Sequence, residues 1–275
     1  MRPEEDQTLL PSPGADTDPG AGAGRLEASD APAAEPFDDT PPPEADEPLA
    51  PGLYLVGTPI GNLEDITLRA LRVLRTAHAI LAEDTRHTGL LLARYGIRTP
   101  LVSYHKFNER ARVDAILDRI RAGAALALVS DAGMPGISDP GARAAAAVRA
   151  AGLPVTAVPG PSAVVTAVAL CGCSDTPSFL FEGFLDHKTA ARRRRLRELD
   201  ALGCPAVLYE STHRIEKLLD EVEEELGPDR ILFVARELTK KFEETLRGTP
   251  AELRRHFQTH SHKGEFVVIL EPAAR

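Results

Sequence analysis

One segment, residues 125–141 with the sequence ALALVSDAGMPGISDPG, restricts the fold of this chain more than any other. It opens with an apolar run typical of a fully buried parallel strand and continues into a loop rich in glycine, proline and polar residues. Gly133 and Gly136 allow the backbone to approach a ligand closely, and Pro135 between them stiffens the loop. The segment therefore predicts a strand that ends in a shaped, ligand-binding loop.

The residues after this loop predict a helix over 142–151. Asp139 and Pro140 suit the N-cap and the first helical position, because an Asp side chain accepts from free amides and proline has no amide to lose. The loop then lies at the carboxyl end of a strand and in front of a helix, where open α/β sheets bind ligands. A tight turn that only connects two elements is the alternative, but 130–140 is longer than such a connection needs.

Strands and helices alternate regularly before and after this segment. Each apolar run is followed by a polar loop and an amphipathic or small-residue helix, which predicts an α/β fold with a parallel sheet covered by helices on both faces. The expected strands are 53–56, 78–82, 101–103, 125–129 and 154–158.

A second α/β domain with its own sheet is expected after residue 172. Strands are predicted at 179–181, 206–209, 231–235 and 265–271, with a strongly basic helix at 187–201. Thr249, Pro250 and Glu252 form a capping-box pattern at the start of a later helix. The predicted domains are therefore 51–172 and 173–275.

The N-terminal 50 residues differ in composition from the rest of the chain. They carry 13 of the 41 acidic residues, two arginines and 10 of the 23 prolines, so the net charge of -9 arises in this segment. With few large apolar side chains it cannot bury enough surface to offset its ordering entropy, and residues 1–50 are expected to be a disordered acidic tail. No apolar run reaches the roughly 20 residues of a membrane span, and no signal peptide is evident, so we expect a cytoplasmic protein.

The three cysteines do not predict a metal site. Cys171 and Cys173 form a C-x-C pair that could hold a metal, but no histidine lies near it in the sequence. Reduced, buried thiols are the favoured interpretation for these residues and for Cys204.

Eight sequence blocks carry a family resemblance. In chain order they are VGTPIGNLEDIT, EDTRHTGLLL, SYHKFNE, SDAGMPGISDPG, VPGPSAV, FEGFL, YESTHRI and RELTKKFEE. Together they resemble the 16S ribosomal RNA (cytidine-2′-O)-methyltransferase family of the tetrapyrrole methylase superfamily, over essentially residues 51–271. Phe107 departs from the pattern at a position where many relatives have a histidine. The matched blocks include no small helical C-terminal domain, so RNA docking is expected to use the two α/β domains.

The resemblance implies that S-adenosylmethionine binds in a cleft between the two domains. It also implies a homodimer and, as substrate, 16S ribosomal RNA or the small ribosomal subunit. The positions that match the family's donor-binding loops are Gly57, Pro59, Asp131, Ala132, Gly133, Met134, Pro135, Gly136, Pro159, Gly160, Pro161, Ser162, Ala163, Phe184, Leu185, Glu210 and Ser211.

Methyl transfer to a ribose 2′-hydroxyl needs a proton acceptor, or a cation that stabilises the alkoxide, within hydrogen-bond reach. Among polar residues at the expected strand ends, His105 or Asp84 could accept the proton, and Lys106 or Arg86 could stabilise the oxyanion or hold a phosphate. Ion pairing and helix capping explain Asp84 and Arg86 equally well.

The basic helix is a candidate RNA-binding element. Lys188 and Arg192, Arg193, Arg194 and Arg195 lie close together in sequence and suit a phosphate backbone. The alternative is a solvated helix whose arginines pair with nearby acids.

Two other functions remain open from the sequence. A tetrapyrrole C-methyltransferase of a precorrin or sirohaem pathway would share the sheet and the donor cleft. A ribosome-assembly binder without catalytic activity would keep the fold, although the intact glycines of the donor loops argue against it.

Overall fold

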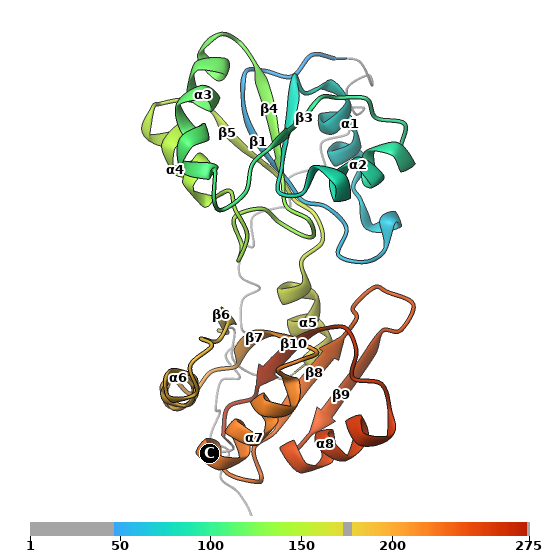
Figure 1. Ribbon diagram of the computed structural model, residues 1–275, viewed down its shortest axis with the longest axis vertical. Helices are drawn as coiled ribbons and strands as arrows, with labels where there is room; N and C mark the ends of the chain where they lie inside the picture. The colour runs from blue at the N-terminus through green and yellow to red at the C-terminus, as the bar shows by residue number, and fades with distance from the viewer. Residues whose placement is uncertain (1–46, 173–177, 274–275) are drawn as a thin grey trace, which may run out of the picture. The chain divides into compact units, whose positions relative to one another are not determined.

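The computed structural model describes residues 47–172 and 178–273 (Figure 1). The predicted tail therefore lies almost wholly outside the described residues, and Cys173 lies outside them too. The chain divides into two units, 1–42 and 43–275, and every element below belongs to the second. Within the described part, no helix is long and apolar enough to cross a membrane.

The first sheet is fully parallel, as the sequence predicts. Its strands are arranged in the order β3-β2-β4-β1-β5. The bounds are β1 Gly52–Val56, β2 Ala79–Ala82, β3 Leu101–Ser103, β4 Ala125–Val129 and β5 Val155–Val158. The connecting elements are η1 Leu63–Asp65, α1 Leu68–Thr76, α2 Thr85–Arg94, α3 Glu109–Arg121 and α4 Ala142–Ala150.

Side-chain alternation along β4 explains why helices cover both faces of this sheet. Ala127 and Val129 pack in one core cluster with residues of α1 and α2, whereas Leu126 and Leu128 pack in another with residues of α3 and α4. The strand is buried along its whole length. This two-sided burial places the carboxyl ends of the strands, and the loops that follow them, along one edge.

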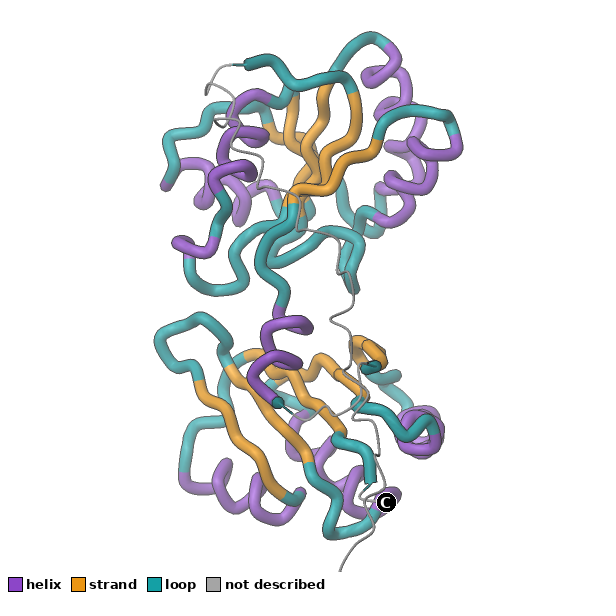
Figure 2. The backbone as a smooth tube through the Cα atoms, turned by 180° about the vertical axis from the view of Figure 1, so that it is seen from behind, coloured by secondary structure: helices purple, strands orange, loops and turns teal. Residues whose placement is uncertain are grey.

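Helix α5, Ala163–Cys171, covers the second sheet rather than the first. Its Val164 and Ala167 are buried against Val207, Phe233 and Ile269. Figure 2 shows this helix lying against the second sheet. The helix is almost entirely apolar and comes soon after β5, so the sequence does not reveal which sheet it covers.

The second sheet is mixed and has the order β6-β7-β10-β8-β9. Its strands are β6 Leu180–Phe184, β7 Ala206–Ser211, β8 Leu232–Arg236, β9 Glu244–Gly248 and β10 Glu265–Leu270; β6 runs parallel to β7, and the other pairs are antiparallel. Helices α6 Thr189–Ala201, α7 Ile215–Leu226 and α8 Pro250–Thr259 pack on the face opposite α5. The sequence analysis missed β9, because this edge strand is short and has no apolar run.

Of the two helix-capping predictions, the one for α8 is confirmed and the one for α4 is wrong. Thr249 and Glu252 form the predicted capping box with Pro250 in the first turn of α8. Asp139, in contrast, is not an N-cap: Gly141 occupies that position of α4 with φ 140°, and the Asp139 side chain lines a cavity described below. The prediction for Asp139 is therefore wrong.

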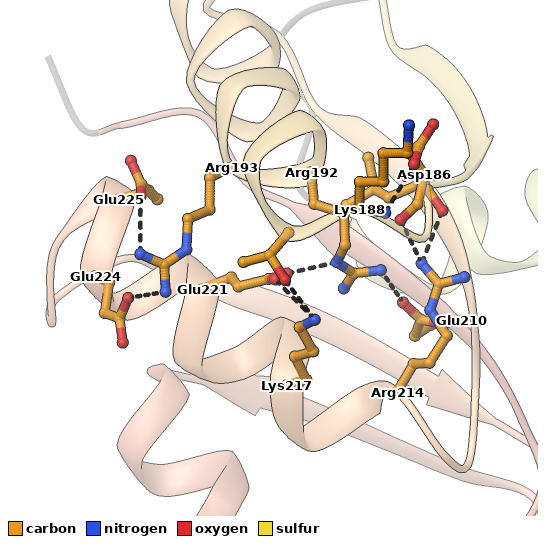
Figure 3. A network of polar contacts seen from close by, with 12 residues as sticks. Asp186, Lys188, Arg192, Arg193, Glu210, Arg214, Lys217, Glu221, Glu224 and Glu225 are labelled. Atoms are coloured by element: carbon orange, nitrogen blue, oxygen red, sulfur yellow. Dashed lines mark hydrogen bonds and ion pairs between the residues drawn. The ribbon is translucent and has the colours of Figure 1, made fainter.

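Arg192 on α6 is a fully buried cation. Its side chain has no exposed surface, and it donates from Nη1 to Glu210 at 3.2 Å and from Nε to Glu221 at 2.6 Å (Figure 3). Glu210 also pairs with Arg214, and Glu221 lies 3.8 Å from Lys217. This network joins α6, β7 and α7 through a core of three buried groups, Arg192, Glu210 and Glu221.

We expect Arg192→Met to lower the free energy of unfolding by about 3–5 kcal/mol, because it removes the buried cation that Glu210 and Glu221 share and leaves each with only a more exposed partner. Denaturant unfolding followed by circular dichroism measures the change. The control Arg194→Met lies on the same helix with 71% of its side chain exposed, and should alter stability by less than about 0.5 kcal/mol. Adding Glu221→Gln should restore part of the stability. Equal stability of Arg192→Met and Arg194→Met would contradict this account.

Candidate functional site

A cavity of about 290 Å³ lies at the carboxyl ends of several strands in the unit 43–275. Its walls come from the loop after β1, the loop after β4, the start of α5, the ends of β6 and β7, and the region around β8 and β10. The lining residues are Ile60, Ala132, Gly133, Met134, Ile137, Ser138, Asp139, Ser162, Ala163, Phe184, Tyr209, Glu210, Ser211, Ala235, Glu237, Leu238, Lys240, Glu265, Phe266 and Val267.

Part of the predicted donor-binding set lines this cavity. Those residues are Ala132, Gly133, Met134, Ser162, Ala163, Phe184, Glu210 and Ser211. Pro59 and Asp131 instead line a second cavity of about 120 Å³ beside Thr58, Leu63, His87, Leu90 and Leu91. The remaining predicted residues, Gly57, Pro135, Gly136, Pro159, Gly160, Pro161 and Leu185, line neither cavity.

Gly57 and Gly160 lie where two loops meet, and neither position has room for a side chain. A Cβ atom on Gly57 would lie 2.7 Å from the Gly160 Cα, and one on Gly160 would lie 2.9 Å from the Gly57 backbone. The contact brings the loop after β1 against the loop after β5. The same Cβ position on Gly57 would lie 2.7 Å from the sulfur of Met134, which lines the cavity, so the contact adjoins the cavity wall.

The central loop is held in place by backbone hydrogen bonds. Thr58 and Gly133 form a two-way bridge, with both N–H groups donating at 3.0 Å. Gly133 has φ +74° and Gly136 has φ +86°, conformations that glycine adopts without steric cost. Both glycines are thus required by the path of the loop, and Gly133 also exposes its backbone to the cavity.

Leu185 does not form part of the cavity wall. Its side chain is 4% exposed and packs in the core with Leu196 and Leu199 of α6. Neighbouring Phe184 lines the cavity, because successive side chains at the end of β6 point to opposite faces. The Leu185 side chain therefore cannot contact a ligand in this cavity, and donor binding by this residue stays a prediction for its backbone alone.

Tyr209 forms an aromatic wall that the sequence analysis missed. Its ring lies 5.0 Å from the ring of Phe181 and 5.6 Å from that of Phe184, measured between centroids. Burial, followed by the nearby charge of Asp139, raises the pKa of Tyr209 to about 12. Tyr209 immediately precedes Glu210 in the block YESTHRI. Its position at the end of a predicted strand was the feature of the sequence that could have identified it as a site residue.

Glu210 supports the wall and offers no free charge. Its side chain is 1% exposed, and its carboxylate is paired with Arg192 and Arg214. The carboxylate also accepts a hydrogen bond from the Ser211 amide at 2.9 Å. The buried network of Figure 3 therefore fixes the end of β7 where it meets the cavity.

Asp139 brings a titratable carboxyl group to the cavity. Burial, with the nearby charges of Glu83 and Asp131, raises its pKa to about 6. Glu83 follows β2 and Asp131 follows β4, so the parallel strands bring these acids together from distant parts of the chain. Asp139 is thus a half-buried carboxyl group that lines the candidate site and has a pKa raised to about 6.

The predicted catalytic residues lie outside the lining of the larger cavity. Asp84 caps α2 and pairs with Arg86, whose hydrogen bonds lower the pKa of Asp84 well below its usual range. His105 approaches Asn108 through Nε2 at 3.3 Å, while its buried Nδ1 has no hydrogen-bond partner among the described residues. The Lys106 ammonium lies 5.0 Å from the centre of the exposed Phe107 ring.

The basic helix does not present all its arginines to solvent. Arg192 cannot contact an RNA phosphate, because its side chain is fully buried between two carboxylates. The prediction that it binds RNA is wrong. Arg193 pairs with Glu224 and Glu225, and Arg195 pairs with Glu182 and Glu198.

The other predicted RNA-binding residues are more accessible. Arg194 pairs with Glu198 at 3.5 Å but remains 71% exposed, and Lys188 at the start of α6 is exposed. The Arg86 side chain is 90% exposed although it contacts Asp84. These three cations can reach solvent without breaking a buried network.

Comparison with known proteins agrees with this architecture. Residues 52–254 match the family model of tetrapyrrole (corrin/porphyrin) methylases. A solved cobalt precorrin-4 methyltransferase superposes with a TM-score of 0.59 at 20% sequence identity, over 79% of this chain and 93% of that one. At this identity the likeness shows a common fold.

Curated relatives are considerably closer in sequence. The chain is 48% identical over 224 residues to the ribosomal RNA small subunit methyltransferase I of Xylella fastidiosa (strain Temecula1), covering 81% of this chain and 82% of the relative. It is 45% identical over 218 residues to the protein of the same name from Thermotoga maritima, covering 79% of this chain and 97% of the relative. The chain therefore belongs to the tetrapyrrole methylase family, in the same branch as the proteins named ribosomal RNA small subunit methyltransferase I.

Proposed function

We propose that this protein uses S-adenosylmethionine to methylate RNA of the small ribosomal subunit, at the 2′-hydroxyl of a cytidine in 16S ribosomal RNA. The 48% identity to a ribosomal RNA small subunit methyltransferase I carries the proposal for an RNA substrate. The eight ordered sequence blocks support the finer assignment to a cytidine 2′-hydroxyl.

The chemistry of the larger cavity suits the proposed donor. Ile60, Met134, Leu238 and Val267 give it an apolar lining, and backbone groups of Ala132 and Gly133 border it. Within the described part of the chain, the acidic side chains that line the cavity outnumber its one cation, Lys240, and this negative balance suits a donor that carries a cationic sulfonium. When bound, the donor supplies a methyl group already activated for displacement by a nucleophile.

Asp139 is our added candidate for the proton acceptor. A carboxyl group with a pKa of about 6 is mostly ionised at pH 7. It is also better suited as a general base than an ordinary Asp, because a general base works best when its pKa lies near the operating pH. Asp84 is less suited, because its two oxygens already bind Arg86 and its pKa is lowered. After β3, His105 remains a candidate for the proton acceptor, and Lys106 remains a candidate for stabilising the oxyanion.

RNA docking is proposed to depend on the accessible cations. Arg86, Lys188 and Arg194 can contact phosphates directly, whereas Arg193 and Arg195 would exchange a carboxylate partner for a phosphate.

The homodimer and the cytoplasmic location stay predictions that follow from the resemblance and the composition. Donor titration separates this enzyme from a ribosome-assembly binder that has lost activity.

Incubation of the protein with radiolabelled S-adenosylmethionine tests the reaction. We expect label to enter 16S ribosomal RNA of small subunits that lack the modification, and alkaline hydrolysis to leave the modified linkage intact, because a 2′-O-methyl group blocks cleavage. Naked 16S ribosomal RNA and a uroporphyrinogen substrate are run in parallel. Label in the tetrapyrrole alone, or in a base of the RNA, would overturn the proposal.

The pH dependence of single-turnover methyl transfer tests Asp139. If its ionised form accepts the proton, the rate should rise with pH through about 6 and then level off. Asp139→Asn should lower the rate by roughly 10²–10⁴-fold and remove this limb. Asp84→Asn serves as a comparison and should keep this limb, because the lowered pKa of Asp84 places its own titration well below pH 6. An unchanged profile in Asp139→Asn would exclude the assignment.

A further inference from the structure

Three charged residues of alternating sign line one side of the larger cavity. The Lys240 ammonium donates to Glu237 Oε1 and to Glu265 Oε2, each at 2.8 Å. Glu237 Oε1 also accepts from the Glu265 amide at 3.0 Å, so the group is tied to the start of β10. We call Glu237, Lys240 and Glu265 the charged triad.

The backbone that carries this triad is held in an unusual conformation. Glu237 has φ +50° and Thr239 has φ +64°, in the left-handed region that non-glycine residues rarely occupy. The Lys240 amide closes the turn by donating to the Glu237 carbonyl at 3.0 Å. Such strain persists only where surrounding contacts enforce it, and it is concentrated at ligand sites. The turn brings Leu238 and Lys240 to the cavity.

The triad is more than a structural ion pair between sheet elements. The Glu265 side chain is 83% exposed, so its attraction to Lys240 is screened and adds little to stability, whereas the Glu237 side chain is 19% exposed and holds Lys240 in place. Burial opposes the charge on Lys240, but its hydrogen bonds to Glu237 and Glu265 outweigh this and raise its pKa. The ammonium therefore stays charged and accessible at the cavity.

The amino-acid end of S-adenosylmethionine carries a complementary set of charges. It has an α-ammonium and an α-carboxylate, with the cationic sulfonium beyond them, whereas the triad has one cation between two carboxylates. Among the described residues that line the cavity, Lys240 is the only cation. Arg192 and Arg214 already neutralise Glu210, so Glu210 does not compete for the donor.

We propose that the charged triad binds the zwitterionic amino-acid end of the methyl donor. The Lys240 ammonium donates to the donor's carboxylate, and the Glu265 carboxylate accepts from the donor's ammonium. This inference rests on the proposed use of S-adenosylmethionine, but not on the identity of the methyl acceptor. It assigns a binding role to the RELTKKFEE block, which the proposed reaction alone leaves without one.

Two adenosine ligands test the proposal by calorimetric titration. S-adenosylhomocysteine has the amino-acid end, while 5′-methylthioadenosine has the same thioether but lacks the amino-acid end. We expect Lys240→Met to weaken S-adenosylhomocysteine binding by about tenfold, the loss of one charge-assisted contact. Binding of 5′-methylthioadenosine should change less than about twofold. Glu265→Gln should give a smaller loss in the same direction.

Lys241→Met is the matched control, because Lys241 is the next residue and its ammonium lies 5.5 Å from the ring centre of Phe242, away from the cavity lining. This variant should bind both ligands like the wild type. Circular dichroism and denaturant unfolding establish that each variant is folded.

The alternative outcomes are distinct. An equal loss for both ligands would show that Lys240 only shapes the wall, and no loss for either would remove it from the site. Weaker RNA binding with unchanged ligand affinity would mean that Lys240 contacts a phosphate. Each of these results overturns the inference. A wild-type protein that binds S-adenosylhomocysteine but methylates no ribosomal RNA would instead overturn the proposed substrate and leave the triad assignment standing.

Discussion

The geometry of the candidate site depends on backbone contacts between loops that follow different strands. Gly57 and Gly160 approach too closely to admit a side chain, and Thr58 and Gly133 exchange hydrogen bonds at the same edge. Backbone contacts of this kind leave little freedom for the loops to move independently. They set the position of the central loop, and hence of Gly133 and Asp139 at the cavity.

The second part of the cavity wall depends on a buried charge. Arg192 on α6 compensates Glu210 and Glu221, while Arg214 donates to the carbonyl of Leu185 at 2.7 Å and pairs with Glu210. These contacts tie the end of β6 to the end of β7, where Phe184 and Tyr209 form the aromatic wall. A buried ion pair is weak evidence for added stability, but removal of one partner is costly. We therefore interpret the network as fixing the wall in one arrangement.

Charges around the cavity are divided between groups that are satisfied and groups that are accessible. Glu210 is neutralised by arginines and excluded from water, whereas Asp139 and the charged triad lie where a ligand can reach them. The different surroundings give the carboxyl groups different properties, because burial near other acids raises the pKa of Asp139 while Lys240 helps to lower that of Glu237 against the effect of burial. A proton acceptor and a charge-recognition site can thus coexist at one cavity.

The sequence alone determined the features that depend on local patterns. Apolar runs followed by polar loops and helices predicted the parallel sheet, and the residues of the 125–141 segment identified the loop that lines the cavity. The capping box of α8 was also predictable, because its hydrogen bonds join residues three apart. The ordered blocks identified the family for a related reason: they record residue types at fixed spacing.

Tertiary structure decided the features that depend on distant partners. The arginines of α6 look equivalent in sequence, yet Arg192 is buried because α7 and β7 supply Glu221 and Glu210. Asp139 serves the cavity instead of capping α4, and α5 packs on the second sheet although it follows a strand of the first. Tyr209 and Lys240 join residues from the central loop only in the folded chain. Local spacing specifies which face of an element is apolar, whereas long-range packing decides which partner covers that face and which charges it meets.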